Sequence, residues 1–162
     1  MNPTPDGGFV MGGIYTPDFS PSSATILKLD GQGNLQWWKD IPGSAAIHGP
    51  YTGEWDLKPT ADGGYIAVGT LGSQAVYLKL DSNAELVWSK TSNTGGGVIE
   101  KGYSVIEAST GGYYVGGSQL EVPAVFRIDE NGEPIETIGF YQGLVSDLIE
   151  DVDGNIAIVG SL

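Results

Sequence analysis

Two Asp-rich stretches have the residue types of a calcium site. Residues 129–133 read Asp-Glu-Asn-Gly-Glu and residues 151–155 read Asp-Val-Asp-Gly-Asn, which places oxygen ligands at alternate positions, as in the first half of a calcium loop. The twelfth position, where such a loop needs a Glu, is Phe140 in one case and Leu162 in the other. Asp and Asn are also what tight turns select. We therefore expect hairpin turns and no cofactor, with calcium as the alternative.

His48 is the one histidine of the chain and the natural candidate for a general base. Ser44 and Asp56 stand near it in sequence, but no nucleophile-elbow phrase surrounds them. The glycine pairs at 63–64 and 111–112 precede neither a helix nor a Gly-Lys-Ser/Thr phrase, so we interpret them as turn glycines that supply positive φ. No motif marks a pair of carboxylates for glycoside hydrolysis. The sequence favours a non-catalytic protein over an enzyme.

The two glycine pairs and the second Asp-rich stretch belong to a repeated phrase. It reads Asp-Gly-Gly followed by an apolar run, or a close variant, and its copies begin at Asp6, Asp62, Thr110 and Asp153, at intervals of 56, 48 and 43 residues. A second phrase, Leu-Lys-Leu-Asp or its equivalent, begins at residues 27, 78 and 126. Self-similarity at a period of about 40–50 residues indicates a stacked or radial array of one supersecondary unit.

Each repeat unit divides into four short strands. In the clearest copy they cover residues 104–107, 113–117, 124–128 and 134–140, and Asp, Asn and Gly residues form the turns between them. Such runs predict β-hairpins, and no segment has the 3.6-residue apolar period of a helix. Four antiparallel strands per unit predict an all-β protein, a β-propeller of four-stranded antiparallel blades. A β-solenoid and a sandwich fit the repeat less well.

The blade count predicts an incomplete ring. The repeat units cover residues of about 1–50, 51–98 and 99–142, with a partial unit at 143–162, within a single propeller segment over 1–162. We expect the chain to open in a second strand at 9–13 and to end in another at 156–159, which makes about three and a half blades. Closed propellers have four to eight blades. A piece of a longer propeller is favoured over a ring completed by oligomerisation, although open sheet edges also permit self-association.

The segment between the third and fourth strands carries a family resemblance. Residues 29–37 and 80–88 share Leu-Asp, a turn, an apolar residue and a Trp, namely Trp37 and Trp88, which we expect to pack between blades. The pattern resembles the blades of quinoprotein-like (PQQ-like) propellers and of related bacterial cell-surface propellers. The third copy has Glu136 in place of the Trp. The resemblance implies an extracellular, cell-surface or periplasmic protein. A quinoprotein dehydrogenase would use pyrroloquinoline quinone and calcium, but the adjacent cysteines of those enzymes are absent.

The charge balance excludes two classes of partner. The chain has 162 residues, with 7 Lys and Arg against 20 Asp and Glu, a net charge of −13. Nucleic acids and anionic membranes are bound through Lys and Arg, so neither is an expected partner. No run approaches the roughly 18 apolar residues that cross a membrane, and we expect no membrane insertion.

Variable loops on one face of the propeller are the expected functional site. The longest covers residues 40–54, and others cover 15–23 and 91–103; irregular loops on a fixed scaffold are where binding usually resides. Aromatic residues beside carboxylates suit a glycan or a peptide. The candidate ligand-binding residues are Asp18, Phe19, His48, Tyr51, Glu54, Trp55 and Tyr103. We expect a binding or structural module of a larger extracellular protein. The alternatives are a fragment of a quinoprotein-type dehydrogenase and a hydrolase with acidic residues at the channel entrance.

Overall fold

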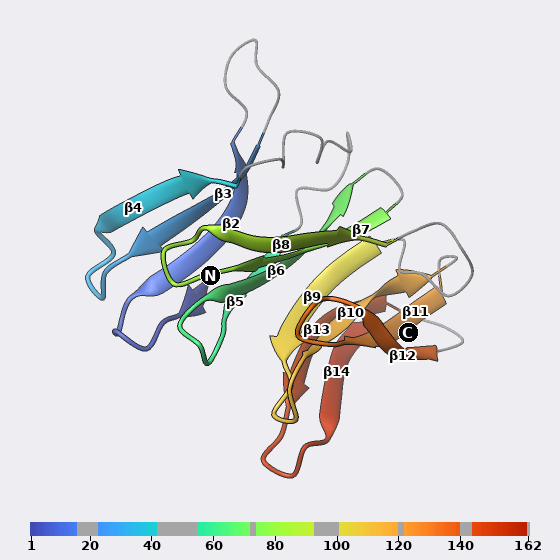
Figure 1. Ribbon diagram of the computed structural model, residues 1–162. Helices are drawn as coiled ribbons and strands as arrows, with labels where there is room; N and C mark the ends of the chain where they lie inside the picture. The colour runs from blue at the N-terminus through green and yellow to red at the C-terminus, as the bar shows by residue number, and fades with distance from the viewer. Residues whose placement is uncertain are drawn as a thin grey trace.

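A computed structural model describes residues 1–15, 23–41, 55–71, 74–92, 101–119, 122–139 and 144–161. All regular structure in these residues is β-strand, which confirms the all-β prediction (Figure 1). Five of the expected ligand-binding residues lie outside the described part of the chain: Asp18, Phe19, His48, Tyr51 and Glu54.

The strands of the described residues form three four-stranded antiparallel sheets and one two-stranded sheet, and in every sheet the strands follow their order in the chain. The first sheet contains β1 (Asn2–Pro3), β2 (Phe9–Tyr15), β3 (Ser23–Leu29) and β4 (Leu35–Asp40). The second contains β5 (Asp56–Pro59), β6 (Tyr65–Leu71), β7 (Gln74–Leu80) and β8 (Leu86–Thr91). The third contains β9 (Lys101–Glu107), β10 (Tyr113–Gln119), β11 (Val122–Ile128) and β12 (Pro134–Gly139), and the fourth β13 (Leu144–Glu150) and β14 (Ile156–Ser161).

The first sheet has one strand more than the sequence predicted. The chain was expected to open in a second strand, but β1 precedes it and pairs with β2 through Pro3 and Phe9. The side-chain amide of Asn2 donates a hydrogen bond of 2.6 Å to the carbonyl of Leu57 in the second sheet. A two-residue strand has no periodicity of its own to read, and its place is set by the turn that follows it and by this contact.

The sheets pack face to face, with a hydrophobic core between each neighbouring pair (Figure 1). Successive side chains of a strand point to opposite faces of its sheet. In β6, Tyr65 and Ala67 therefore enter the core shared with the first sheet, whereas Ile66 and Val68 enter the core shared with the third. The two middle sheets are covered on both faces, which explains their nearly continuous apolar strands.

The Asp-rich turns use their carboxylates internally. Asp129 Oδ1 accepts hydrogen bonds of 2.8 Å from the backbone N–H groups of Asn131 and Glu133, and Asp151 Oδ1 accepts equivalent bonds of 2.9 Å. The bond from Glu133 is the main cause of the lowered pKa of Asp129. Within the described ranges, no group of three or more His, Cys, Asp or Glu side chains is placed to hold a metal ion. The geometry of both turns is that of a side-chain-capped hairpin turn.

The two glycines of the Asp-Gly-Gly phrase serve different purposes. Gly63 has a φ of 81°, in the left-handed region that favours glycine. Gly64 does not, but a Cβ atom there would stand 2.2 Å from the carbonyl oxygen of Leu80 in the third strand. From the sequence we expected both glycines of this pair to adopt a positive φ. The second is instead required by the close approach of the neighbouring strand.

Candidate functional site

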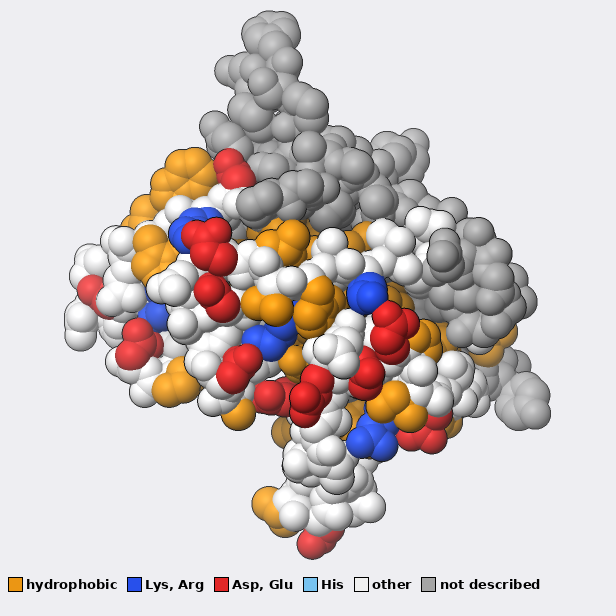
Figure 2. All heavy atoms as spheres, viewed as in Figure 1, with side chains coloured by type: hydrophobic (Ala, Val, Ile, Leu, Met, Phe, Trp, Pro, Cys, Tyr) orange, Lys and Arg blue, Asp and Glu red, His pale blue; other side chains and the backbone are white. Residues whose placement is uncertain are grey.

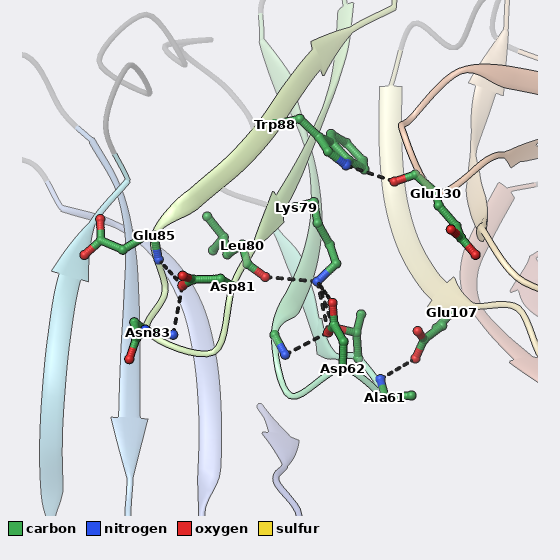
Figure 3. A network of polar contacts seen from close by, with 12 residues as sticks. Ala61, Asp62, Lys79, Leu80, Asp81, Asn83, Glu85, Trp88, Glu107 and Glu130 are labelled. Carbon is green, nitrogen blue, oxygen red and sulfur yellow. Dashed lines mark hydrogen bonds and ion pairs between the residues drawn. The ribbon is translucent and has the colours of Figure 1, made fainter.

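A buried lysine holds the first turn of the second sheet to its third strand (Figure 3). The ammonium nitrogen of Lys79 donates to Asp62 Oδ2 at 2.8 Å, to the Leu80 carbonyl at 3.0 Å and to Thr60 Oγ1 at 3.1 Å. The hydrogen bond from Lys79, followed by that from Thr60, lowers the pKa of Asp62 to about 2. The first sheet repeats the arrangement with Lys28 and Asp6, also 2.8 Å apart. These ion pairs hold each hairpin turn to the third strand of its sheet, so both charges are used within the fold.

The third sheet has different residue types at the two positions of this ion pair. Thr110 replaces the Asp and Arg127 replaces the Lys, and the guanidinium donates to Thr110 Oγ1 at 2.7 Å. The guanidinium also lies over the ring of Tyr114, with its carbon 5.6 Å from the ring centroid, a cation–π contact. The Nε of Arg127 is buried and has no hydrogen-bond partner in the described part of the chain. The repeat keeps a cation at this position but not its carboxylate.

The two equivalent tryptophans pack between sheets, as predicted. Trp37 of β4 meets Tyr65 of the second sheet edge-on at 6.3 Å between ring centroids, and Trp88 of β8 meets Tyr113 of the third at 6.2 Å. Trp88 Nε1 also donates to the carbonyl of Glu130 at 3.0 Å (Figure 3). Burial is the main cause that raises the pKa of Tyr113 to about 12. Both tryptophans are therefore structural.

A polar cluster joins the first strands of the second, third and fourth sheets. Asp56 in β5, Ser104 in β9 and Asp147 in β13 occupy one repeat position, 48 and 43 residues apart. Ser104 Oγ lies 3.2 Å from Asp56 Oδ2 and 2.9 Å from Asp147 Oδ1. The backbone N–H of Val105 also donates to Asp56 Oδ2, at 3.0 Å. We call Asp56, Ser104, Asp147 and the neighbouring Lys58 the inner cluster.

Lys58 offsets part of the negative charge of the inner cluster. Its ammonium nitrogen is 3.6 Å from Asp56 Oδ1 and 3.8 Å from Asp147 Oδ1. A serine hydroxyl has one proton and can donate to one carboxylate at a time, so a nearby cation is needed to hold two carboxylates beside it. Ser104 is 1% exposed, and a substrate atom cannot reach its hydroxyl. The cluster therefore links three sheets through side-chain contacts. Its serine is unsuited to nucleophilic catalysis.

Trp55 and Tyr103 are the expected ligand-binding residues that the structure describes. They occupy equivalent positions directly before Asp56 and Ser104, so they lie at the same end of two adjacent first strands. Both side chains are half-buried. Trp55 packs against the first core and its Nε1, which is buried, has no acceptor among the described residues. Trp55 thus directly precedes β5 and Tyr103 is the third residue of β9, and each is the chain neighbour of a member of the inner cluster.

Sequence reasoning missed Ser104 and Asp147 and treated Asp56 only as a sequence neighbour of His48. The available signal was spacing, because each member of the trio lies six residues before the first position of the repeated phrase. Asp18, Phe19, His48, Tyr51 and Glu54 fall outside the described residues, so their expected role in binding stays a prediction.

No protein-family model matches the sequence, and no curated protein is significantly similar to it. No helix in the described ranges is long and apolar enough to cross a membrane. Acidic side chains are spread over the visible face of the molecule, with fewer basic ones between them (Figure 2).

Proposed function

We propose that the chain is a segment of a β-propeller whose sheets are successive blades, and that it is a non-catalytic binding or structural module. In this proposal it belongs to a larger extracellular, cell-surface or periplasmic protein and binds a protein or a glycan. The similarity of its repeated phrases to those of quinoprotein-like and bacterial cell-surface propellers supports this assignment.

The observation that carries the proposal is the side-by-side arrangement of equivalent first strands. Propeller blades are four-stranded sheets placed around a central channel, and that geometry brings the first strands of neighbouring blades together. The inner cluster joins three such strands through Ser104 and its two carboxylate partners. Face-to-face packing with a core between every neighbouring pair of sheets is the second requirement. Both features support successive blades.

The proposed binding face is the end of the sheets opposite the Asp-Gly turns. The turns at 4–8, 60–64, 108–112 and 151–155 close one end of the first hairpins. Trp55 and Tyr103 lie at the other end, where the long connections enter β5 and β9. Aromatic rings with a polar group combine a large apolar surface with a hydrogen-bonding edge, which suits sugar rings and peptide side chains alike.

A glycan array and a displayed peptide library test the binding face. We expect a ligand whose affinity falls at least about tenfold when Tyr103 is replaced by Ala, because an interface aromatic contributes more than about 1.4 kcal/mol. Trp38, an exposed tryptophan on the outer strand β4, provides the matched control. Trp38→Ala should leave the affinity unchanged. Equal losses in the two variants, or no ligand on either array, would count against the proposal.

The enzymatic alternatives have their own tests. A panel of glycoside and ester substrates examines hydrolysis, and a redox spectrum with added pyrroloquinoline quinone and calcium examines quinoprotein chemistry. We expect neither turnover nor a reduced-cofactor spectrum, since the serine of the inner cluster is inaccessible and the turn carboxylates accept their own backbone hydrogen bonds. Turnover that disappears on replacing Asp147 would establish a hydrolase instead.

A further inference from the structure

The turn between β11 and β12 contains a chemically labile pair of residues. Asn131 is followed there by Gly132, and this is the one Asn-Gly pair in the sequence. Asparagine is thermolabile in proteins, because the backbone nitrogen of the next residue can attack the carbon of the side-chain amide. A following glycine favours the attack, since it has no Cβ atom to crowd the ring that forms and its backbone is the most permissive.

The equivalent turn of the second sheet has the same geometry without the glycine. Asn83 and Ala84 occupy the same repeat positions there. The backbone N–H of Ala84 donates to the carbonyl of Asp81 at 3.0 Å, and that of Gly132 donates to the carbonyl of Asp129 at 3.0 Å. Both residues have a positive φ, 58° for Ala84 and 79° for Gly132. The two turns therefore hold the attacking nitrogen in the same way, and the Cβ atom of Ala84 distinguishes them.

The exposure of Asn131 is a property of its position in the turn. Asn131 is exposed in the third sheet, and Asn83 is exposed in the second sheet, although that sheet has a core on each face. Gln32, at the same position of the first sheet, is exposed as well. Water therefore reaches this position even where both faces of the sheet are covered.

The same turn holds the third sheet to the second (Figure 3). Trp88 Nε1 donates to the carbonyl of Glu130 at 3.0 Å, and Lys90 Nζ donates to Glu133 Oε1 at 2.6 Å. A Cβ atom on Gly132 would lie 2.9 Å from the ring of Trp88, so the indole packs directly on this glycine. An extra main-chain atom before Gly132 would displace the turn from the indole ring.

We propose that Asn131 is a site of spontaneous deamidation and that isoaspartate formed there loosens the contact of the turn with Trp88. The backbone nitrogen of Gly132 bonds to Cγ of Asn131 and the side-chain nitrogen leaves as ammonia, which closes a succinimide ring. Water then opens the ring. Attack at the side-chain carbonyl gives aspartate, and attack at the main-chain carbonyl gives isoaspartate, whose main chain runs through Cβ and Cγ. The proposal does not depend on the binding function proposed above.

Peptide mapping by mass spectrometry after incubation of the intact protein in neutral buffer tests the reaction. We expect deamidation at Asn131 to be at least about tenfold faster than at Asn83, a difference of about 1.4 kcal/mol in activation free energy. The mass gained when the amide becomes a carboxylate separates this reaction from isomerisation at the Asp-Gly pairs, which leaves the mass unchanged. Equal rates at Asn131 and Asn83 would overturn the proposal.

Two variants link the rate to the named residues. Ala84→Gly creates a second Asn-Gly pair in the equivalent turn, and it should raise the rate at Asn83 at least about tenfold. Asn131→Gln should abolish the fast reaction in the third sheet, since a glutamine closes the ring more slowly and Gln32 already occupies this position in the first sheet. An unchanged rate at Asn83 in Ala84→Gly would contradict the role assigned to the glycine.

Hydrogen exchange of the Trp88 indole N–H, followed by nuclear magnetic resonance, tests the structural effect. Ion exchange separates the aged protein by its additional negative charge, and an isoaspartyl methyltransferase assay identifies the isoaspartate fraction. The indole N–H should exchange several-fold faster in that fraction than in fresh protein. Freshly prepared Asn131→Asp adds the same charge on a normal main chain and should keep the slow exchange. Slow exchange in the isoaspartate fraction, or equally fast exchange in Asn131→Asp, would overturn the proposed effect.

Discussion

Strands β6 and β14 carry the same repeated phrase and have opposite environments. Strand β6 lies between two sheets and beside two strands, and its described side chains are all buried. Among the described strands, β14 has a neighbour on one edge only, and most of its side chains are exposed. Burial in a repeat array is therefore set by the neighbours of a unit and not by the local sequence pattern.

The largest expected difference is between Leu80 and its equivalent Leu29. Leu80 is fully buried between the first and second sheets, whereas Leu29 is half-buried on the opposite face of the first sheet. Leu80→Ala should lower the free energy of unfolding by about 2–5 kcal/mol, the cost of a core cavity. Leu29→Ala should cost clearly less. Urea denaturation measures both, and equal losses would show that the first sheet is covered on its outer face in solution.

The pair Val68 and Val159 tests the comparison with identical side chains. Val68→Ala should cost about 2 kcal/mol because a fully buried valine is truncated. Val159→Ala should change stability by less than about 0.5 kcal/mol, as an exposed substitution does. Thermal unfolding of the two variants measures both changes in stability. A large loss of stability for Val159→Ala would mean that β14 is already covered in the isolated chain.

The Lys79–Asp62 ion pair of the second sheet predicts that stability depends on pH. The pKa of Asp62 is lowered from 3.8 to about 2, so its contribution to stability is present above pH 4 and is lost as the pH falls toward 2. Lys79→Met should cost about 1 kcal/mol at pH 7, the worth of an average hydrogen bond, and should flatten this acid-dependent loss. Lys90→Met removes an exposed pair with Glu133 and is the control. Parallel acid curves for the wild-type protein and Lys79→Met would contradict the prediction.

The smallest expected difference between paired variants is at Thr110 in the third sheet. Thr110→Asp restores the carboxylate that the first and second sheets have, and it should raise stability by about 0.5 kcal/mol through a pair with Arg127. Thr110→Asn, of the same shape without the charge, should not. A gain that is equal for both variants would assign the effect to the turn and not to the ion pair.

The hairpins could be predicted from the sequence because Asp, Asn and Gly turn residues mark where the first strand of a unit passes into the second and where the third passes into the fourth. The strands expected at 113–117 and 124–128 lie within β10 and β11, and the expected inter-sheet role of Trp37 and Trp88 is confirmed. The inner cluster could not be predicted in the same way. Ser104 contacts Asp56 and Asp147 across three repeat units, and neither a local pattern nor a turn signal reports a contact between sheets.

The sequential order of the strands also bears on how the chain acquires its structure. Within each sheet, every strand after the first pairs with the strand before it in the chain, so each hairpin can close as soon as its second half leaves the ribosome, within microseconds for an isolated hairpin. A hydrophobic core, however, forms only between two sheets. Each newly synthesised sheet therefore keeps an uncovered apolar face until the next sheet packs against it. Synthesis from the N-terminus thus sets the order in which the cores exclude water.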